Sequence, residues 1–289
     1  MRILILGSTG MLGRAVSNEF ENLDAEVVAL SRASGFEVDE RLISRPMILG
    51  GSRVREFDWI INCIGVTKTH IDPKSPESVK RATIVNSVFP NLLADEARSA
   101  GVKVLQVATD CVYSGAKGFY VESDDHDPLD VYGKTKSLGE AKATSIMHLR
   151  CSLVGPEASG KSTLFYEWLR NLESGTKVRG FTNHYWNGLT SEAFARIAAA
   201  IVTSDLFHPG IQHLVPADTL SKFDLVRLIL EKLGREDVSI EAFEHATRID
   251  RTLSTENQAI NDSLFAAAGF ETPPPVSLML EGLACKPRE

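Results

Sequence analysis

The stretch Gly7-Ser8-Thr9-Gly10-Met11-Leu12-Gly13 follows directly on an apolar run, Arg2–Leu6, and opens a segment with helical periodicity, Met11–Phe20. A strand, a glycine-rich turn and a helix in this order are typical of a dinucleotide-binding unit. The glycines allow a tight turn, and they let backbone N–H groups at the start of the helix approach a pyrophosphate. We therefore expect these residues to form the first βα unit of such a fold.

Apolar runs and amphipathic segments alternate from this turn as far as residue 154. Runs that are apolar on both faces predict a parallel sheet covered by helices on two sides. Strands are expected at Arg2–Leu6, Glu26–Leu30, 58–64, 102–108 and 147–154, and helices at Met11–Phe20, 78–100 and 131–145. The pattern predicts an α/β fold of the Rossmann type, with a doubly wound parallel sheet. Residues 33–57 are irregular, and no strand is predicted there.

The pattern changes after residue 154. Loops are expected at 155–160 and 176–188, helices at 162–172, 191–202, 220–233 and 276–284, and one short strand at 212–215. We interpret residues 1–154, plus about 189–216, as a dinucleotide-binding domain, and residues 155–188 and 217–289 as a smaller α/β substrate lobe.

The composition limits the classes of molecule that this protein is expected to bind. The 289 residues carry a net charge of −7, and lysines and arginines are scattered among acids, which argues against nucleic acid. The first apolar run is too short to cross a bilayer, so no membrane association is expected. The chain has four cysteines, Cys63, Cys111, Cys151 and Cys285, and they do not have the spacing of metal ligands. We therefore expect reduced thiols, no bound metal and a cytoplasmic location. Six histidines are expected at the surface or in loops: His70, His126, His148, His208, His213 and His245.

The end of the second predicted strand bears on the choice of cofactor. A site for NAD(H) favours an acidic residue there, which accepts a hydrogen bond from the ribose 2′-hydroxyl. Here Ser31 and Arg32 follow the strand, and a hydroxyl and a guanidinium suit a 2′-phosphate. The sequence therefore favours NADP(H) over NAD(H).

Three side chains are candidates for proton transfer. Tyr132 and Lys136 share one face of a predicted helix, and a nearby ammonium lowers the pKa of a phenol, which then serves as a general acid. Thr109 follows the strand predicted at 102–108, at the sheet edge where doubly wound folds bind ligands. Its hydroxyl is suited to donate to a carbonyl oxygen that gains negative charge.

Motifs spread over the chain occur in the order of a known family. They are the glycine turn, Asn62-Cys63-Ile64-Gly65, Val85-Asn86, Ala108-Thr109-Asp110-Cys111-Val112-Tyr113, Tyr132-Gly133-Lys134-Thr135-Lys136, Gly139-Glu140 and Leu149-Arg150-Cys151-Ser152. The chain resembles the extended short-chain dehydrogenase/reductases, and within them the dTDP-4-dehydrorhamnose reductases, which reduce the 4-keto group of nucleotide-sugars. The resemblance covers nearly the whole length and is densest in residues 1–155.

The resemblance implies an NAD(P)-dependent oxidoreductase of deoxysugar and polysaccharide biosynthesis, whose partner is a small nucleotide-sugar. It implies that Tyr132 protonates the substrate oxygen, that Thr109 polarises it, and that Lys136 holds the nicotinamide ribose and lowers the pKa of Tyr132. Residues implied to line the cofactor, besides Gly7, Thr9, Gly10 and Gly13 of the turn, are Met11, Leu12, Cys63, Ile64, Gly65 and Val107; those facing the sugar are Asp110 and Leu153. A homodimer is left open.

Departures from the family pattern leave the nucleotide and the sugar open. Cys111 stands where the family has an aromatic residue, and Leu153 stands where it has a tryptophan. A cysteine near this strand end also fits an enzyme that both epimerises and reduces, as in related GDP-fucose synthases, or it is an inert thiol. Some relatives bind NADP as non-catalytic regulatory subunits. Residues 155–162 also fit the phosphate-binding pattern GxxxxGK[ST], which would indicate an NTPase.

The predicted substrate lobe supplies cations and aromatic rings. Lys177 and Arg179 form a basic pair, and Tyr185 and Trp186 an aromatic pair. A nucleotide-sugar needs cations for its diphosphate and flat apolar surface for its base or sugar. Arg251 is a further candidate for the diphosphate, because a guanidinium forks onto phosphate oxygens. Trp186 has two interpretations, a substrate contact or a residue of the lobe core.

Overall fold

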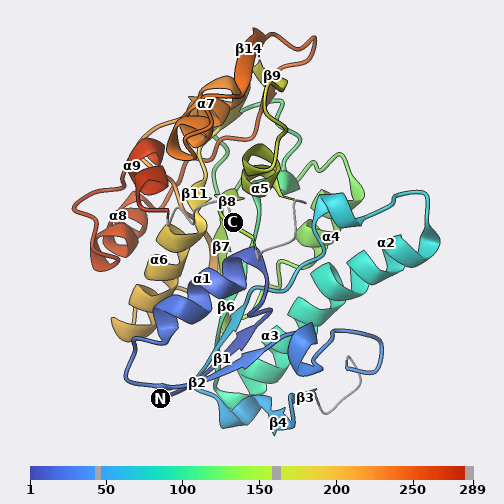
Figure 1. Cartoon of the computed structure of the whole chain (residues 1–289). Coiled ribbons are helices and arrows are strands. Elements are labelled where there is room, and N and C mark those ends of the chain that lie inside the picture. The colour runs from blue at the N-terminus through green and yellow to red at the C-terminus, as the bar shows by residue number, and fades with distance from the viewer. Residues whose placement is uncertain (43–46, 158–163, 284–289) are drawn as a thin grey trace.

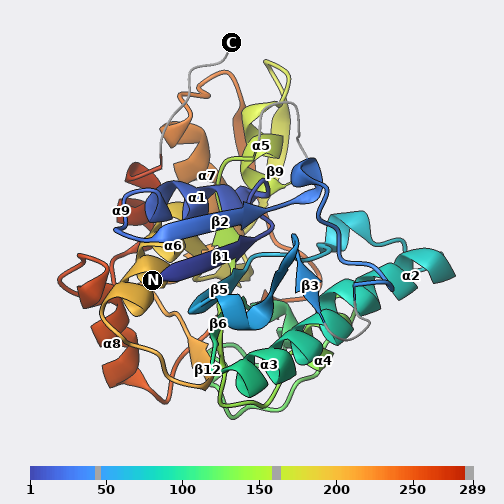
Figure 2. The same ribbon diagram turned by 90° about the horizontal axis from the view of Figure 1, so that it is seen from below.

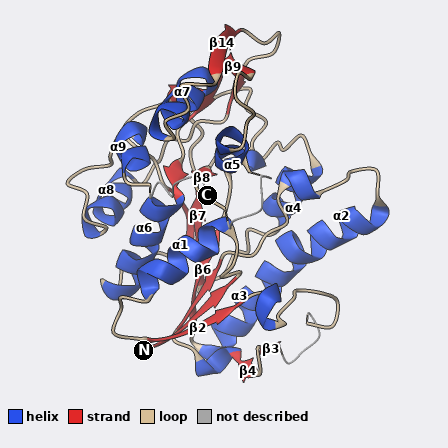
Figure 3. Cartoon of the chain, viewed as in Figure 1, coloured by secondary structure: helices blue, strands red, loops and turns tan. Residues whose placement is uncertain are grey.

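The computed structural model describes residues 1–42, 47–157 and 164–283. Its centre is a sheet of six parallel strands, in the order β12-β7-β6-β5-β1-β2 (Figures 1 and 3). The strands are β1 (Arg2–Leu6), β2 (Glu26–Leu30), β5 (Trp59–Asn62), β6 (Lys103–Val107), β7 (Ile146–Arg150) and β12 (Gly210–His213). The chain runs outward from β1 in both directions, so the predicted doubly wound Rossmann-type sheet is confirmed.

Helices cover both faces of this sheet, as Figure 2 shows. On one face α1 (Met11–Phe20) packs against α6 (Ser191–Thr203), and on the other lie α2 (Pro76–Thr83), α3 (Phe89–Ala100) and α4 (Val131–Leu138). Side chains of a strand alternate between the faces. Ile3 and Ile5 therefore join the core under α1 and α6, while Leu4 and Leu6 join the core under α3.

Shorter elements lie outside the main sheet. Strand pairs are β3 (Ile48–Leu49) with β4 (Ser52–Arg53), β8 (Leu153–Val154) with β11 (Leu189–Thr190), and β9 (Lys177–Phe181) with β14 (Ser239–Phe243). Strand β10 (His184–Trp186) lies between β13 (Leu220–Ser221) and β15 (Ile249–Asp250). The remaining helices are α5 (Phe165–Arg170), α7 (Lys222–Lys232), α8 (Gln258–Ala267) and α9 (Val276–Glu281). Figure 1 shows α7, β9 and β14 gathered at the end of the molecule opposite the N-terminus.

Several predicted elements were wrong in type or extent. The loop predicted at 176–188 contains β9 and β10, whose pairing partners lie about 35 to 65 residues further on and give no local signal. The helix predicted at 131–145 ends at Leu138, and a π-helical turn, Ile84–Val88, interrupts the one predicted at 78–100. Helix α8 and strand β14 were not predicted. His148 and His213, expected at the surface, have no exposed area.

Two predictions fall partly outside the described residues: the GxxxxGK[ST] pattern with the start of the next helix, and the end of the last helix. The division into two domains stays a prediction. Within the described ranges, every helix is too short or too polar to cross a bilayer.

Candidate active site

The glycine turn leaves the start of α1 open to a ligand. Gly10 caps α1 with an extended backbone and has no side chain that could bond to the N–H groups of the helix, and the first turn of α1 holds no acidic residue. A Cβ on Gly13 would lie 2.1 Å from the Gly7 carbonyl oxygen, so only glycine lets helix and turn approach this closely. The N–H groups at this end are oriented to receive a pyrophosphate. The residues present therefore fit a dinucleotide.

Ser31 and Arg32 follow β2 at the neighbouring strand end. Ser31 is buried, and its backbone exchanges hydrogen bonds with the Ser34 hydroxyl, at 2.9 Å from its N–H and 2.8 Å to its carbonyl oxygen. These two hydrogen bonds hold the turn that contains Arg32, and the side chain of Arg32 is exposed there. A guanidinium in that position suits a phosphate.

The residues that follow β5 lie at the next strand end of the sheet. Cys63 and Ile64 are half-buried and Gly65 is exposed. The buried Asn62 side chain accepts from the Ile64 N–H at 3.1 Å and donates to Gln106 Oε1 at 2.8 Å, which ties β5 to β6. Burial raises the pKa of the Cys63 thiol to about 12, so this side chain is a neutral surface beside the turn.

Helix α4 carries Tyr132 and Lys136 and is closely fixed at its start. The Asp130 carboxylate accepts from the Gly133 N–H at 2.8 Å and caps the helix. A Cβ on Gly133 would lie 2.2 Å from the Cys111 carbonyl oxygen, so a glycine is needed where α4 crosses the chain after β6.

The sequence motifs named Asn86 without a role, and the structure supplies one. Its Nδ2 donates to the Thr135 hydroxyl at 3.1 Å and to the Val66 carbonyl at 2.9 Å, and its Oδ1 accepts from the Val66 N–H at 2.9 Å. Asn86 lies in the π-helical turn, a distortion that is frequent at functional sites. It thus links α4 to the chain after β5.

Lys136 does not act on Tyr132 as predicted. Its ammonium donates to the Val107 carbonyl at 2.7 Å, and burial lowers its pKa to about 8. Burial raises the pKa of Tyr132, and the charge of a Cys111 thiolate would raise it further, while a hydrogen bond with Thr109 opposes the rise. Desolvation of the phenol outweighs the effects that lower its pKa, so this pKa lies above its ordinary value and not below it, as was predicted.

Thr109, Asp110 and Cys111 form one turn after β6. The Thr109 hydroxyl donates to Asp110 Oδ1 and accepts from the Cys111 N–H, both at 3.2 Å. Burial raises the pKa of Asp110, while the charges of Arg251 and Lys222 lower it. Burial also raises the pKa of Cys111 to about 12.

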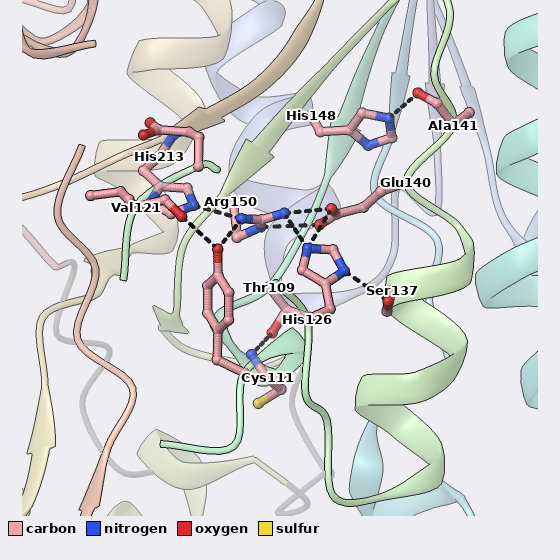
Figure 4. Close-up of polar contacts among 12 residues, drawn as sticks. Thr109, Cys111, Val121, His126, Ser137, Glu140, Ala141, His148, Arg150 and His213 are labelled. Atoms are coloured by element: carbon pink, nitrogen blue, oxygen red, sulfur yellow. Dashed lines mark hydrogen bonds and ion pairs between the residues drawn. The ribbon is translucent and has the colours of Figure 1, made fainter. Parts of the chain in front are cut away.

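A buried cluster around Arg150 lies behind this turn (Figure 4). The guanidinium donates to both Glu140 oxygens, to the Tyr113 hydroxyl at 2.5 Å, to His213 Nε2 at 2.7 Å and to His126 Nε2 at 2.9 Å. These bonds use all five of its N–H groups, so both imidazoles serve as neutral acceptors. Burial lowers the pKa of both histidines, to about 4 for His213.

The structure places the predicted substrate residues as follows. Arg251 Nε donates to the Tyr113 carbonyl at 2.8 Å, close to the Thr109 turn. Trp186 is buried, and its Nε1–H donates to Ser152 Oγ at 2.7 Å. Leu153 is half-buried on β8. Sequence reasoning missed Lys222, whose charge acts on Asp110, because nothing near it in the sequence marks a site.

A family model described as the RmlD substrate binding domain matches residues 1–278. The chain belongs to this family. A curated relative, a dTDP-4-dehydrorhamnose reductase of Mycolicibacterium smegmatis, is 25% identical over 252 residues, which are 81% of this chain and 70% of the relative. The beta subunit of methionine adenosyltransferase 2 of Xenopus tropicalis is 33% identical over 141 residues, which are 48% of this chain and 41% of that protein. The resemblance to extended short-chain reductases of nucleotide-sugars is thereby confirmed.

Solved structures show the same fold. A dTDP-4-dehydrorhamnose reductase from Bacillus anthracis in complex with NADP has a TM-score of 0.75 at 18% identity, over 98% of each chain. An ortholog from Clostridium acetobutylicum has a TM-score of 0.74 at 22% identity, also over 98% of each chain. The predicted oxidoreductase class agrees with this family membership.

Proposed function

We propose that this member of the RmlD substrate binding domain family reduces a keto group of a nucleotide-linked deoxy sugar with NADPH, and that Tyr132 delivers the proton. The observation that carries the proposal is the meeting of Tyr132 and Thr109. Thr109 is buried and Tyr132 is half-buried at the carboxyl edge of the sheet, and a hydrogen bond with Thr109 acts to lower the pKa of Tyr132. That edge is where ligands bind in doubly wound folds.

The side chains have complementary tasks in such a reduction. NADPH, when bound at the glycine turn, would supply the hydride for the carbonyl carbon. Because burial raises its pKa, Tyr132 stays protonated at neutral pH and has a proton to give to the carbonyl oxygen. The Thr109 hydroxyl donates to the same oxygen. Lys136, fixed by the Val107 carbonyl, would hold the nicotinamide ribose of the bound cofactor.

NADP(H) is the cofactor that the strand end of β2 supports. The exposed Arg32 and the hydroxyl of Ser31 suit a 2′-phosphate, and a structural neighbour was solved in complex with NADP.

Neither alternative has a comparable observation in its favour. An epimerase that uses Cys111 as a base needs its thiolate, and a pKa of about 12 leaves little thiolate at neutral pH. A regulatory subunit has no need of the Thr109, Tyr132 and Lys136 set that this chain retains.

The deciding experiment is a turnover screen. The chain is supplied with NADPH and with 4-keto-6-deoxy sugars linked to dTDP, GDP, CDP or UDP, and cofactor oxidation is followed by absorbance. We expect oxidation with at least one of the four. Oxidation with none of them, by a folded protein that binds NADPH, would point to the regulatory alternative.

A further inference from the structure

Two cations from separate elements act electrostatically on the Asp110 carboxylate. Lys222 is the first residue of α7, and Arg251 directly follows β15. The charges of both act on Asp110 and oppose the rise of its pKa on burial. With both cations protonated, this group has an excess of positive charge beside the turn that carries Thr109.

The ammonium of Lys222 lies over two aromatic rings. Its Nζ lies 5.2 Å from the ring centroid of Phe165 and 5.3 Å from that of Trp186. Ring faces attract an ammonium, but they leave its N–H groups without strong acceptors. Besides Asp110, the charged or titratable groups that face it are Cys111, Arg251 and His184. Two of these are cations or potential cations, so the ammonium is well placed for an added anion.

We propose that Lys222, together with Arg251, binds the diphosphate of the nucleotide-sugar, and that Phe165 and Trp186 hold the Lys222 side chain in position. The inference rests on the proposed function, because that function brings a diphosphate next to the reacting sugar. A diphosphate forms charge-assisted hydrogen bonds with an ammonium and with a guanidinium. Lys222 acts on Asp110, next to Thr109, so it lies close to where the sugar would react.

The other basic pair considered for this task has different contacts. Lys177 is 63% exposed and pairs with Glu241 at 3.1 Å on the β9–β14 ribbon. Arg179, on the same strand, lies over the ring of Phe243 at 5.0 Å. We therefore assign the diphosphate to Lys222 and Arg251 instead of to Lys177 and Arg179.

If Lys222 binds the diphosphate, the affinity for a nucleotide-sugar should depend on pH. Burial lowers the pKa of Lys222 to about 8, so its charge is present at pH 7 and is lost as the pH rises through about 8. Binding of a diphosphate should weaken over that interval. Arginine in the same place stays charged throughout and should remove the dependence.

The test uses dTDP-glucose, which has the diphosphate but no keto group, with UDP-glucose and GDP-mannose as further probes. Binding to the full chain is measured by calorimetry at pH 7 and at intervals up to pH 9.5. We expect Lys222→Met to weaken the tightest of the three by on the order of tenfold or more. Lys222→Arg should bind with little change from pH 7 to pH 9.5. Lys177→Met is the matched control and should bind as the wild type does.

Two results would overturn the inference: wild-type protein that binds none of the three probes, or Lys222→Met that binds as tightly as wild type. A lysine that only balances the charge of Asp110 would give the second result, with a lower melting temperature. If Lys222→Met does not fold, the pH profile of Lys222→Arg decides alone, and a fall in its affinity like that of the wild type rejects the inference.

The proposed function can fail separately. If a probe binds in a way that depends on Lys222 but no keto-sugar is turned over, the proposed function is rejected and the diphosphate site is supported.

Discussion

Arg150 donates to both carboxylate oxygens of Glu140, at 3.1 Å from Nε and 2.5 Å from Nη2, and neither side chain is more than 5% exposed. This pair joins strand β7 to the segment that follows α4. Through His126, which also lies 2.7 Å from the Ser137 hydroxyl on α4, the cluster reaches the helix of Tyr132 and Lys136. The buried pair thus helps to fix α4 relative to the sheet.

Replacing Arg150 by methionine should destabilise the fold strongly. The Glu140 carboxylate would remain buried without its partner, and breaking a buried ion pair in this way costs about 3–5 kcal/mol. Urea unfolding followed by circular dichroism measures the change. The control is Arg227→Met on α7, whose exposed pairs with Asp224 and Glu231 are expected to contribute about 0–1 kcal/mol. Equal losses in the two variants would contradict the role given to Arg150.

The neutral state of His213 predicts an acid limb in stability. Burial and the charge of Arg150 lower its pKa from 6.5 to about 4 in the folded chain. The unfolded chain therefore binds a proton between those values that the folded chain does not, and the free energy of unfolding falls as the pH drops from about 6.5 to about 4. His213→Gln retains an acceptor for Arg150 but does not titrate. Its stability should decline less steeply over this interval, and an unchanged slope would contradict the assignment.

The two hydroxyl groups at the reacting centre should differ in their effect on turnover. Tyr132→Phe removes the proton donor and keeps the ring, so turnover should fall by roughly two orders of magnitude or more while NADPH binding survives. Thr109→Val should lower turnover by on the order of tenfold or more, because one donor to the oxygen is lost. Steady-state kinetics and cofactor titration measure both effects. Full activity of Tyr132→Phe would reject the mechanism.

Arg32→Asp should lower or reverse the preference for NADPH over NADH. A carboxylate would repel the 2′-phosphate, and it would accept from the 2′-hydroxyl of NADH. Affinities for the two cofactors, measured by fluorescence titration, give the ratio. A wild type without preference, and a variant like it, would show that Arg32 does not contact the cofactor.

The sequence predicted the elements whose information is local. The glycine turn and strands β1 and β2 lie at the expected residues, because a short apolar run that ends at a turn and an amphipathic helix each leave a pattern within about ten residues. The places of Tyr132 on a helix and of Thr109 at a strand end are local information too, whereas their joint action on one substrate oxygen was implied only by the family resemblance.

Contacts between distant parts of the chain were not predictable. The charge of Asp110 acts on Lys222, although the two residues lie more than a hundred positions apart in the sequence. No sequence pattern near either residue predicts this interaction. His213 was expected at the surface because no sequence pattern shows that a buried arginine on the neighbouring strand needs an acceptor. Strand β9 was read as a loop because its partner β14 lies on the far side of α7 in the sequence.

Trp186 was interpreted either as a substrate contact or as a residue of the lobe core. In the structure it is a core residue that also contacts Lys222, and two substitutions distinguish these roles. Its ring is 5% exposed in the core, while Lys222 Nζ lies 5.3 Å from the centre of that ring. Trp186→Ala removes both contacts, so it should lower the free energy of unfolding by about 3–5 kcal/mol and weaken dTDP-glucose binding. Trp186→Phe keeps an aromatic face under the ammonium and loses the hydrogen bond to Ser152, which is expected to contribute about 1 kcal/mol. Binding by Trp186→Phe should stay close to that of the wild type. If Trp186→Phe loses nucleotide-sugar affinity as severely as Lys222→Met while its melting temperature is unchanged, the indole contacts the ligand itself, and its role as a support for Lys222 is wrong.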